Sequence, residues 1–447
     1  MSAVEDIKAA SSELLTASPA KALLRFALPM IAGNLLQQFY NIADTLIVGR
    51  VLGKTALAAV GSSYTLMTFL TSIFLGLSLG SGALFSIYHG KKDEESLRLS
   101  IVHSFLLIIG VTVILNILVY LFLTPILYFL RVPENVWSGM REYLLIIFAG
   151  LIATSLYNFF SCLLRALGNS TVPLVFLAFS ALLNIALDLL FVAVFSFGIA
   201  GAALATIIAQ YVSGIGILLY VLFRCRDLLP NRQELHFDRQ ILKEIISLSS
   251  MTCVQQSVMN FGILMVQGLV NSFGDTIMAA FAAAVKIDTF AYLPVQDFGN
   301  AYSTFIAQNY GAGKKERIHK GTRQAFLLSS VFSIIISALV CLFAAPLMKI
   351  FVSANENDVI VSGVQYLRIE GACYVGIGFL FLLYGYYRAI KRAEMSVILT
   401  VISLGTRVLL AYVLSTFIGE TGIWLAIPIG WALADITGLI CMCSRKY

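Results

Sequence analysis

Charged residues are scarce in this chain. Aspartate, glutamate, lysine and arginine make up 12% of the 447 residues, whereas hydrophobic residues make up 59% and the mean hydropathy is +0.89. Soluble domains carry about twice that charged fraction and a smaller apolar fraction. The composition therefore argues against an ordinary soluble domain and indicates that lipid surrounds much of the folded surface.

Residues that carry chemistry are also few, and they form no catalytic or metal-binding pattern. The seven cysteines lie mostly inside or at the ends of apolar runs without metal-ligand spacing, and the four histidines form no motif. The sequence contains no nucleophile–base set and no GxxxxGK[ST] phosphate-binding loop. These absences argue against an enzyme, a metalloprotein and an ATP-driven pump, and we expect no cofactor.

Twelve apolar runs are long enough to cross a bilayer as helices, since one span needs about 20 residues. They cover residues 23–48, 57–88, 99–125, 140–164, 171–195, 199–223, 245–272, 277–308, 322–348, 364–388, 395–417 and 422–443. These runs predict an all-α membrane protein with two six-helix bundles. We expect an N-lobe in residues 1–223, a cytoplasmic linker in residues 224–243 and a C-lobe in residues 244–447.

The basic residues are distributed as membrane topology requires, not as a nucleic-acid surface. The net charge is +6, but lysines and arginines occur in short clusters between apolar runs. With both termini in the cytoplasm, 22 of them fall inside and five fall outside. This bias predicts an even number of spans and a multi-pass protein of the inner (plasma) membrane. Residues 1–20 lack a cleavable apolar core, so we expect the first span to act as the targeting signal.

An internal repeat relates the two halves of the sequence. The matches are Gly53 with Gly274, Ala58-Ala59 with Ala279-Ala280, Gly90 with Gly311 and Gly201 with Gly422 at an offset of 221, and Arg165-Ala166 with Arg388-Ala389 at an offset of 223. A near-constant offset across five helices is a poor fit to chance alignment of apolar runs. Because each half has six spans, we expect parallel repeats related by a pseudo-two-fold axis along the membrane normal.

Several of these features together resemble the multidrug and toxic compound extrusion (MATE) family, and within it the DinF-like and MepA-like bacterial group. They are the two six-helix halves, Pro29 early and Asp44 late in the first span, Asn184-x-x-x-Asp188 in the fifth span, and Gln308-Asn309-Tyr310-Gly311-Ala312-Gly313 at the end of the eighth. The resemblance covers nearly the whole chain. It implies a transporter that moves organic compounds.

Two acidic residues inside the first half are the strongest candidates for ion coupling. A carboxylate at the centre of a membrane helix costs roughly 2.5–3.5 kcal/mol, so such groups face a polar cavity or bind an ion. Asp44 and Asp188 both lie well inside predicted spans, and Asn184 shares a helix face with Asp188. Thr206 offers a further oxygen. By resemblance, Asp44, Asn184, Asp188 and Thr206 match the cation site of the family's N-lobe, which would take H⁺ or Na⁺.

The second half lacks this acid set. At an offset of 223, Asn184 and Asp188 fall on Arg407 and Ala411, so we expect ion coupling to belong to the N-lobe. The acids Asp288, Asp297 and Glu370 remain as further candidates, with Lys286, Arg368 and Arg407 as the basic residues within spans. Some family members couple through C-lobe acids on the seventh and tenth spans. A contribution from Glu370 or its neighbours therefore stays open.

The candidates for the substrate cavity are polar and flexible side chains. Gln38, Tyr143 and Asn158 match polar N-lobe cavity positions by resemblance, and Asp297 lies near the middle of the eighth span. Tyr40 and Met259 would contribute an adaptable wall. Packing against other helices or lipid is the usual role of any single aromatic residue here. The glycine-rich stretch Gly76–Gly82 predicts close helix packing or bending.

We interpret the chain as a secondary active antiporter that exports organic, cationic or amphipathic compounds by alternating access, in exchange for H⁺ or Na⁺. We expect a monomer with small organic substrates, embedded in membrane lipid, without a nucleic-acid partner. The alternative is a flippase for lipids or lipid-linked glycans of the same superfamily. A pyrophosphate-binding cavity would need several cations, and only three basic residues fall within spans.

Overall fold

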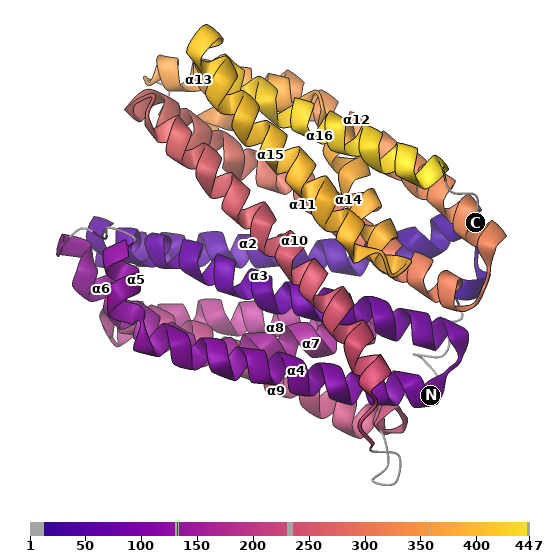
Figure 1. Ribbon diagram of the computed structural model, residues 1–447. Coiled ribbons are helices and arrows are strands. Elements are labelled where there is room, and N and C mark those ends of the chain that lie inside the picture. Colours follow the sequence, from indigo (N-terminus) through magenta and orange to yellow (C-terminus); the bar gives the residue numbers. More distant parts are fainter. Residues whose placement is uncertain (1–12, 130–131, 133, 230–235, 354, 445–447) are drawn as a thin grey trace. The chain divides into compact units, whose positions relative to one another are not determined.

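The computed structural model describes residues 13–129, 132, 134–229, 236–353 and 355–444, and these residues form helices without any strand (Figure 1). Five of the basic residues used above to orient the chain lie outside the described residues, namely Lys8, Arg131, Arg232, Arg445 and Lys446. Residues 230–235 of the predicted linker lie outside them as well. The predicted all-α fold class is confirmed.

The chain forms two compact units, which we call unit 1 and unit 2. Among the described residues, unit 1 contains Ala32–Cys253, and unit 2 contains Leu14–Ile31 together with the part that follows Cys253. Two helices, α2 (Pro19–Leu52) and α10 (Arg239–Asn271), contribute residues to both units. The lobe boundaries expected at residues 223 and 244 stay a prediction.

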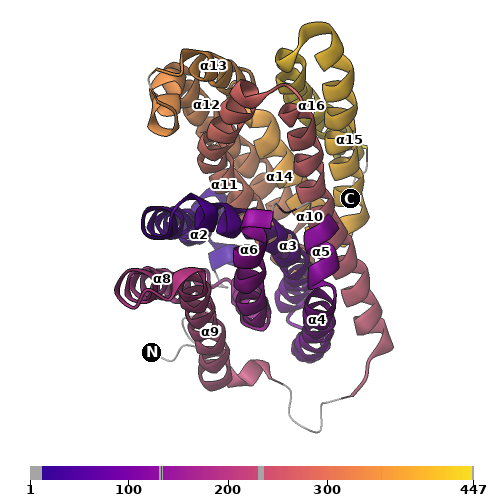
Figure 2. The ribbon, with the colours of Figure 1, turned by 90° about the vertical axis from the view of Figure 1, so that its left-hand side faces the viewer.

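The remaining helices follow the predicted spans closely. Unit 1 adds α3 (Lys54–Lys91), α4 (Glu94–Leu121), α5 (Leu123–Phe129), α6 (Glu134–Ile147), η1 (Phe148–Gly150), α7 (Leu151–Ala166), α8 (Thr171–Asp188), η2 (Leu189–Val194), α9 (Gly198–Arg224) and η3 (Arg226–Leu228). Unit 2 adds α11 (Asp275–Gly311), α12 (Lys315–Phe351), α13 (Asn357–Gly371), α14 (Tyr374–Ala389), α15 (Ala393–Ile418) and α16 (Glu420–Cys443). In Figure 2, α8 lies beside α9 and α15 lies beside α16, and both pairs pack closely.

Ten helical segments of the described chain are long and apolar enough to cross a membrane, and the bent pair α13 and α14 makes an eleventh. The helix α2, with 34 residues, covers the first predicted span but is not one of these segments. Several predicted spans are interrupted, which the apolar runs did not indicate; residues 99–125 pass from α4 into α5, and residues 171–195 pass from α8 into η2. Residues 140–164 pass through η1, and residues 364–388 bend by 51° between α13 and α14.

Left-handed backbone angles recur at the repeat offset. The pairs are Gly53 (φ 86°) with Gly274 (φ 92°), Lys92 (φ 61°) with Gly313 (φ 68°), Gly198 (φ 64°) with Gly419 (φ 63°), and Gly168 (φ 91°) with Lys391 (φ 60°). The first three pairs are separated by 221 residues and the last by 223. Most of these positions carry glycine because a Cβ atom disfavours this region. The connections between helices therefore repeat in conformation as well as in sequence.

A short segment before α2 is held against the start of α12 within unit 2. Residues 13–16 are helical, and the side chain of Leu14 is 2% exposed. The carbonyl of Leu14 accepts hydrogen bonds from Arg317 (Nη2, 3.0 Å) and Asn309 (Nδ2, 3.2 Å), and that of Leu15 from Lys314 (Nζ, 2.9 Å). Cationic donors suit the free carbonyls at a helix C-terminus. We call residues 14–20 the N-terminal strap.

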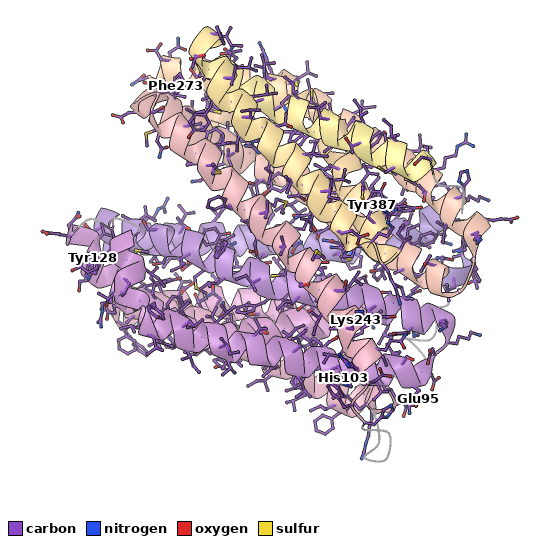
Figure 3. All side chains as sticks on the ribbon, in the orientation of Figure 1. Glu95, His103, Tyr128, Lys243, Phe273 and Tyr387 are labelled. Carbon is purple, nitrogen blue, oxygen red and sulfur yellow. The ribbon has the colours of Figure 1, made fainter. Side chains whose placement is uncertain are left out.

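Hydrogen bonds within each unit fix individual helices. His103 on α4, labelled in Figure 3, accepts from the backbone N–H of Asp238 at 3.3 Å, just before α10 begins. The Asp238 carboxylate accepts from Gln240 N (2.7 Å) and Ile241 N (3.0 Å), which caps α10. Tyr387 on α14, also labelled, donates to the carbonyl of Gly438 on α16 at 2.7 Å. These contacts set the start of α10 against α4 and α14 against α16.

Candidate functional site

Three helices of unit 1 bring the predicted coupling residues together. The helix α2 carries Asp44, α8 carries Asn184 and Asp188, and α9 carries Thr206. Because α8 packs along α9, the amide Nδ2 of Asn184 reaches Thr206 Oγ1 at 3.4 Å. The hydroxyl of Thr206 donates to the carbonyl of Ala202 at 3.0 Å, which leaves its lone pairs on the side of Asn184.

The two carboxyl groups are neighbours. Asp44 is half-buried, Asp188 is fully enclosed, and their side chains lie next to each other. Asp44 Oδ1, Asn184 Oδ1 and both oxygens of Asp188 are buried and accept no hydrogen bond from the described residues. A buried acceptor without a donor is costly. The arrangement therefore suits a proton or a hard cation, since oxygen atoms are the ligands such cations prefer.

Two tyrosines line the acid pair. Tyr40 on α2 and Tyr143 on α6 are each near both Asp44 and Asp188, and Tyr143 also faces Thr206. Tyr143 is 7% exposed, so its hydroxyl is set inside unit 1. Phenolic hydroxyls can donate to carboxylates and accept from a bound ligand. The two tyrosines predicted as cavity residues thus border the ion-coupling candidates.

The backbone changes type immediately after Asp188. The helix α8 ends at this residue, and η2 continues as a π-helix over Leu189–Val194. Such segments are rare and occur often at functional sites because they turn a side chain off the regular helix register. No pattern in the apolar run of residues 189–194 signals this change, so the sequence analysis did not find it.

The other predicted cavity residues occupy separate places. Gln38 is half-buried on α2, and Asn158 on α7 spends one amide hydrogen on the carbonyl of Thr154 at 2.8 Å. Met259 on α10 and Asp297 on α11 belong to unit 2. Met259 is half-buried and Asp297 is 2% exposed. Whether these four residues share a cavity stays a prediction.

The glycine-rich stretch of α3 packs closely against α10, as predicted. A Cβ atom added at Gly76 would lie 2.5 Å from Cys253 Cα, and one at Gly80 would lie 2.5 Å from Ser249 Cα. Beside this contact, Ser81 Oγ and Ser249 Oγ are 3.0 Å apart. Only a residue without a side chain allows the two backbones to approach this closely.

Other polar residues were missed by the sequence analysis. In unit 1, two polar residues near Tyr40 were missed, Gln37, which is half-buried, and Tyr64, which is 54% exposed. In unit 2, Asp435 on α16 is 7% exposed and its Oδ1 has no hydrogen-bond partner among the described residues. A signal for Asp435 was available, because it is an acid inside an apolar run. No three of the histidines, cysteines and acids in the described chain gather as a metal site.

A helical chain of two sequence repeats, with many spans and a buried acid pair inside one repeat, is typical of secondary transporters. The chain belongs to the MatE family, whose model matches residues 29–190 and 250–413. The two matched segments begin 221 and end 223 residues apart, the offsets of the internal repeat. The protein is therefore a multi-pass membrane transporter of this family.

Similar proteins support the assignment over the full length. The chain is 30% identical to the probable multidrug resistance protein YpnP of Bacillus subtilis, over 94% of both chains. It is 27% identical to the probable multidrug resistance protein NorM of Thermotoga maritima, over 93% of this chain and 89% of the relative. A solved structure of a multidrug resistance MATE family transporter in an outward-facing conformation has 25% identity, a TM-score of 0.91 and 97% coverage of both chains.

Proposed function

We propose that this protein exports organic, cationic or amphipathic compounds in exchange for H⁺ or Na⁺, by alternating access. The observation that carries the proposal is the adjacent pair Asp44 and Asp188, in which Asp44 Oδ1 and both oxygens of Asp188 are buried and lack donors among the described residues. The names of the relatives support the export of drugs, since several are called multidrug resistance proteins. Small organic molecules are the substrates that this family membership implies.

In the proposed cycle, the acid pair takes up the coupling cation from outside. Asp44 and Asp188 supply the negative charge, while Asn184 Oδ1 and Thr206 Oγ1 supply neutral oxygens. A ligand shifts a conformational equilibrium only through its different affinity for the two states. The cation must therefore bind more tightly to the state that releases substrate outside. We infer that the π-helix after Asp188 lets the end of α8 change position as the cation binds.

The substrate would contact polar and adaptable side chains. We propose Gln38, Tyr40, Tyr143 and Asn158 from unit 1, and Met259 and Asp297 from unit 2. Aromatic and methionine side chains suit varied apolar substrates because they adapt their packing. We further propose a monomer in the bacterial inner (plasma) membrane with both termini in the cytoplasm.

The test is export from proteoliposomes in which a pH gradient and a Na⁺ gradient are imposed separately. We expect Asp188→Asn to abolish gradient-driven efflux of a fluorescent organic cation, because the amide carries no charge and cannot take up the ion. The matched control is Asp358→Asn, the same change at an exposed acid in the first turn of α13. Undiminished coupled efflux by Asp188→Asn would refute the assignment.

A further inference from the structure

Unit 2 contains a second cluster of buried polar side chains, which comes from four helices. Asp288 lies on α11, Tyr366 and Glu370 on α13, Tyr374 on α14 and Arg407 on α15. The two acids are 6% and 3% exposed and the two tyrosines 1% and 2%. Trp424 on α16 closes the cluster, with its ring 5.0 Å from that of Tyr366.

The groups of this cluster face one another. The carboxyl groups of Asp288 and Glu370 are neighbours, and the hydroxyls of Tyr366 and Tyr374 lie beside Asp288. Arg407 is within electrostatic reach of both acids. Its Nε is buried and has no hydrogen-bond partner among the described residues, like Asp288 Oδ1 and Glu370 Oε2. A half-buried base, whose Nε is buried, and two buried acids thus share one region of unit 2.

The negative charge of the acid pair is balanced differently in the two units. Two adjacent buried carboxyl groups hold one negative charge between them, because like charges in contact repel. In unit 1 no basic side chain of the described chain faces Asp44 or Asp188, so that charge needs a mobile cation. In unit 2 the guanidinium of Arg407 supplies the positive charge from within the protein. Ionisable groups inside membranes pair in this way.

The internal repeat shows which residues of unit 1 occupy the positions equivalent to the cluster of unit 2. At the offset of 223, Arg407 corresponds to Asn184, a proposed cation ligand, and Glu370 corresponds to Ile147. At the offset of 221, Asp288 corresponds to Met67. Ile147 and Met67 belong to the apolar core of unit 1. The acids of unit 2 are therefore not copies of the unit 1 pair, and the arginine stands where unit 1 carries a neutral amide.

We propose that Arg407 is a fixed counter-cation: its guanidinium balances the charge of the Asp288–Glu370 pair, so unit 2 binds no transported cation. Ion coupling is thereby confined to one site per chain. The confinement of ion coupling to one site rests on the proposed function, whereas the charge balance of unit 2 does not. Arg407 is a positioning residue, because its guanidinium holds the Asp288–Glu370 pair in one charge state.

The test removes the fixed charge in full-length protein that also carries Asp44→Asn and Asp188→Asn, so that no carboxyl group of the unit 1 pair can respond. In this background Arg407→Asn leaves the acid pair without a cation and supplies the amide found at Asn184. We expect the melting temperature in detergent to rise by about 5 °C when Na⁺ replaces choline, or when the pH falls from about 7.5 to about 6. Arg407→Lys, which keeps the charge, should show neither response.

Other groups near the cluster do not account for such a response. The further titratable neighbours are Tyr366, Tyr374, Cys341 on α12 and Cys373 between α13 and α14. Ordinary tyrosine and cysteine pKa values lie above about 8. Adding both Asp288→Asn and Glu370→Gln to Arg407→Asn should remove the gain from Na⁺ or acid, because the cluster then holds no carboxyl group. A gain that persists in this variant would overturn the proposal.

Failure of folding would also be informative. If Arg407→Asn alone does not yield folded protein, Arg407→Asn with Asp288→Asn and Glu370→Gln should, because the negative charge that Arg407 balanced has been removed with it. A folded Arg407→Lys beside a triple variant that does not fold would contradict the charge balance. An Arg407→Asn variant that is folded and indifferent to both Na⁺ and pH would contradict it as well. Neither result depends on export, so the proposed function is tested separately by Asp188→Asn.

Discussion

The contact between α3 and α10 allows a sharp test of how the helices of unit 1 approach each other. We expect Gly80→Ala to destabilise the protein because the new methyl group would meet backbone. Its Cβ would lie 2.5 Å from Ser249 Cα and 2.7 Å from the carbonyl oxygen of Leu248. Neither atom belongs to a flexible side chain, so the two helices must separate. Overpacking of this kind costs about 1–3 kcal/mol.

The matched control is Gly110→Ala on α4, where nothing lies within 4 Å of the added Cβ. Both substitutions gain the helix propensity of alanine over glycine, about 1 kcal/mol. The difference between the two variants therefore isolates the packing cost. Guanidinium unfolding in detergent, followed by circular dichroism, should show Gly80→Ala less stable than Gly110→Ala by about 1–3 kcal/mol. Equal stability of the two variants would refute the close backbone contact.

Three further predictions concern single side chains. Thr206→Val keeps the shape but removes an oxygen from the coupling site, so the cation concentration for half-maximal efflux should rise at least about tenfold; an unchanged value would exclude Thr206 as a ligand. Arg317→Ala removes hydrogen bonds to the carbonyl of Leu14 and should lower the free energy of chemical unfolding by about 1–2 kcal/mol. Arg317→Lys should restore part of this loss, and an unchanged stability of Arg317→Ala would contradict the prediction. Hydrogen bonds from Ile241 N and Gln240 N lower the pKa of Asp238 below its ordinary 3.8. The stabilising effect of this carboxylate is therefore present above pH 3.8 and is lost as the pH falls through the lower pKa of the folded state. Asp238→Ala should lower the melting temperature at pH 7 but not under strongly acidic conditions.

The sequence was most informative where one residue type is demanded by local geometry. Gly53 and Gly274 revealed the repeat because both take a positive φ that other residues disfavour. Asp44 and Asp188 were recognisable because an acid inside an apolar run needs a special environment. Their proximity in unit 1 followed from the family resemblance, and the structure brings their side chains together.

Features that depend on contacts between distant residues were harder to predict. The bend between α13 and α14 has no proline to mark it, and the π-helix after Asp188 interrupts an unbroken apolar run. The sequence named Asp288, Glu370 and Arg407 separately but could not show that they meet. The spacing of residues along one helix gives the face they share, whereas their partners on other helices depend on packing.

The N-terminal strap imposes an order on synthesis of the chain. Its residues are synthesised before those they contact, since Leu14 accepts a hydrogen bond from Asn309, which is 295 residues further along the chain. Ala20 donates to Gln324 across an even longer separation of 304 residues. Contacts between such distant positions form late, because the intervening chain must be made before they can close. The strap can therefore form these contacts only after the beginning of α12 has been translated, and unit 2 cannot be completed before that point.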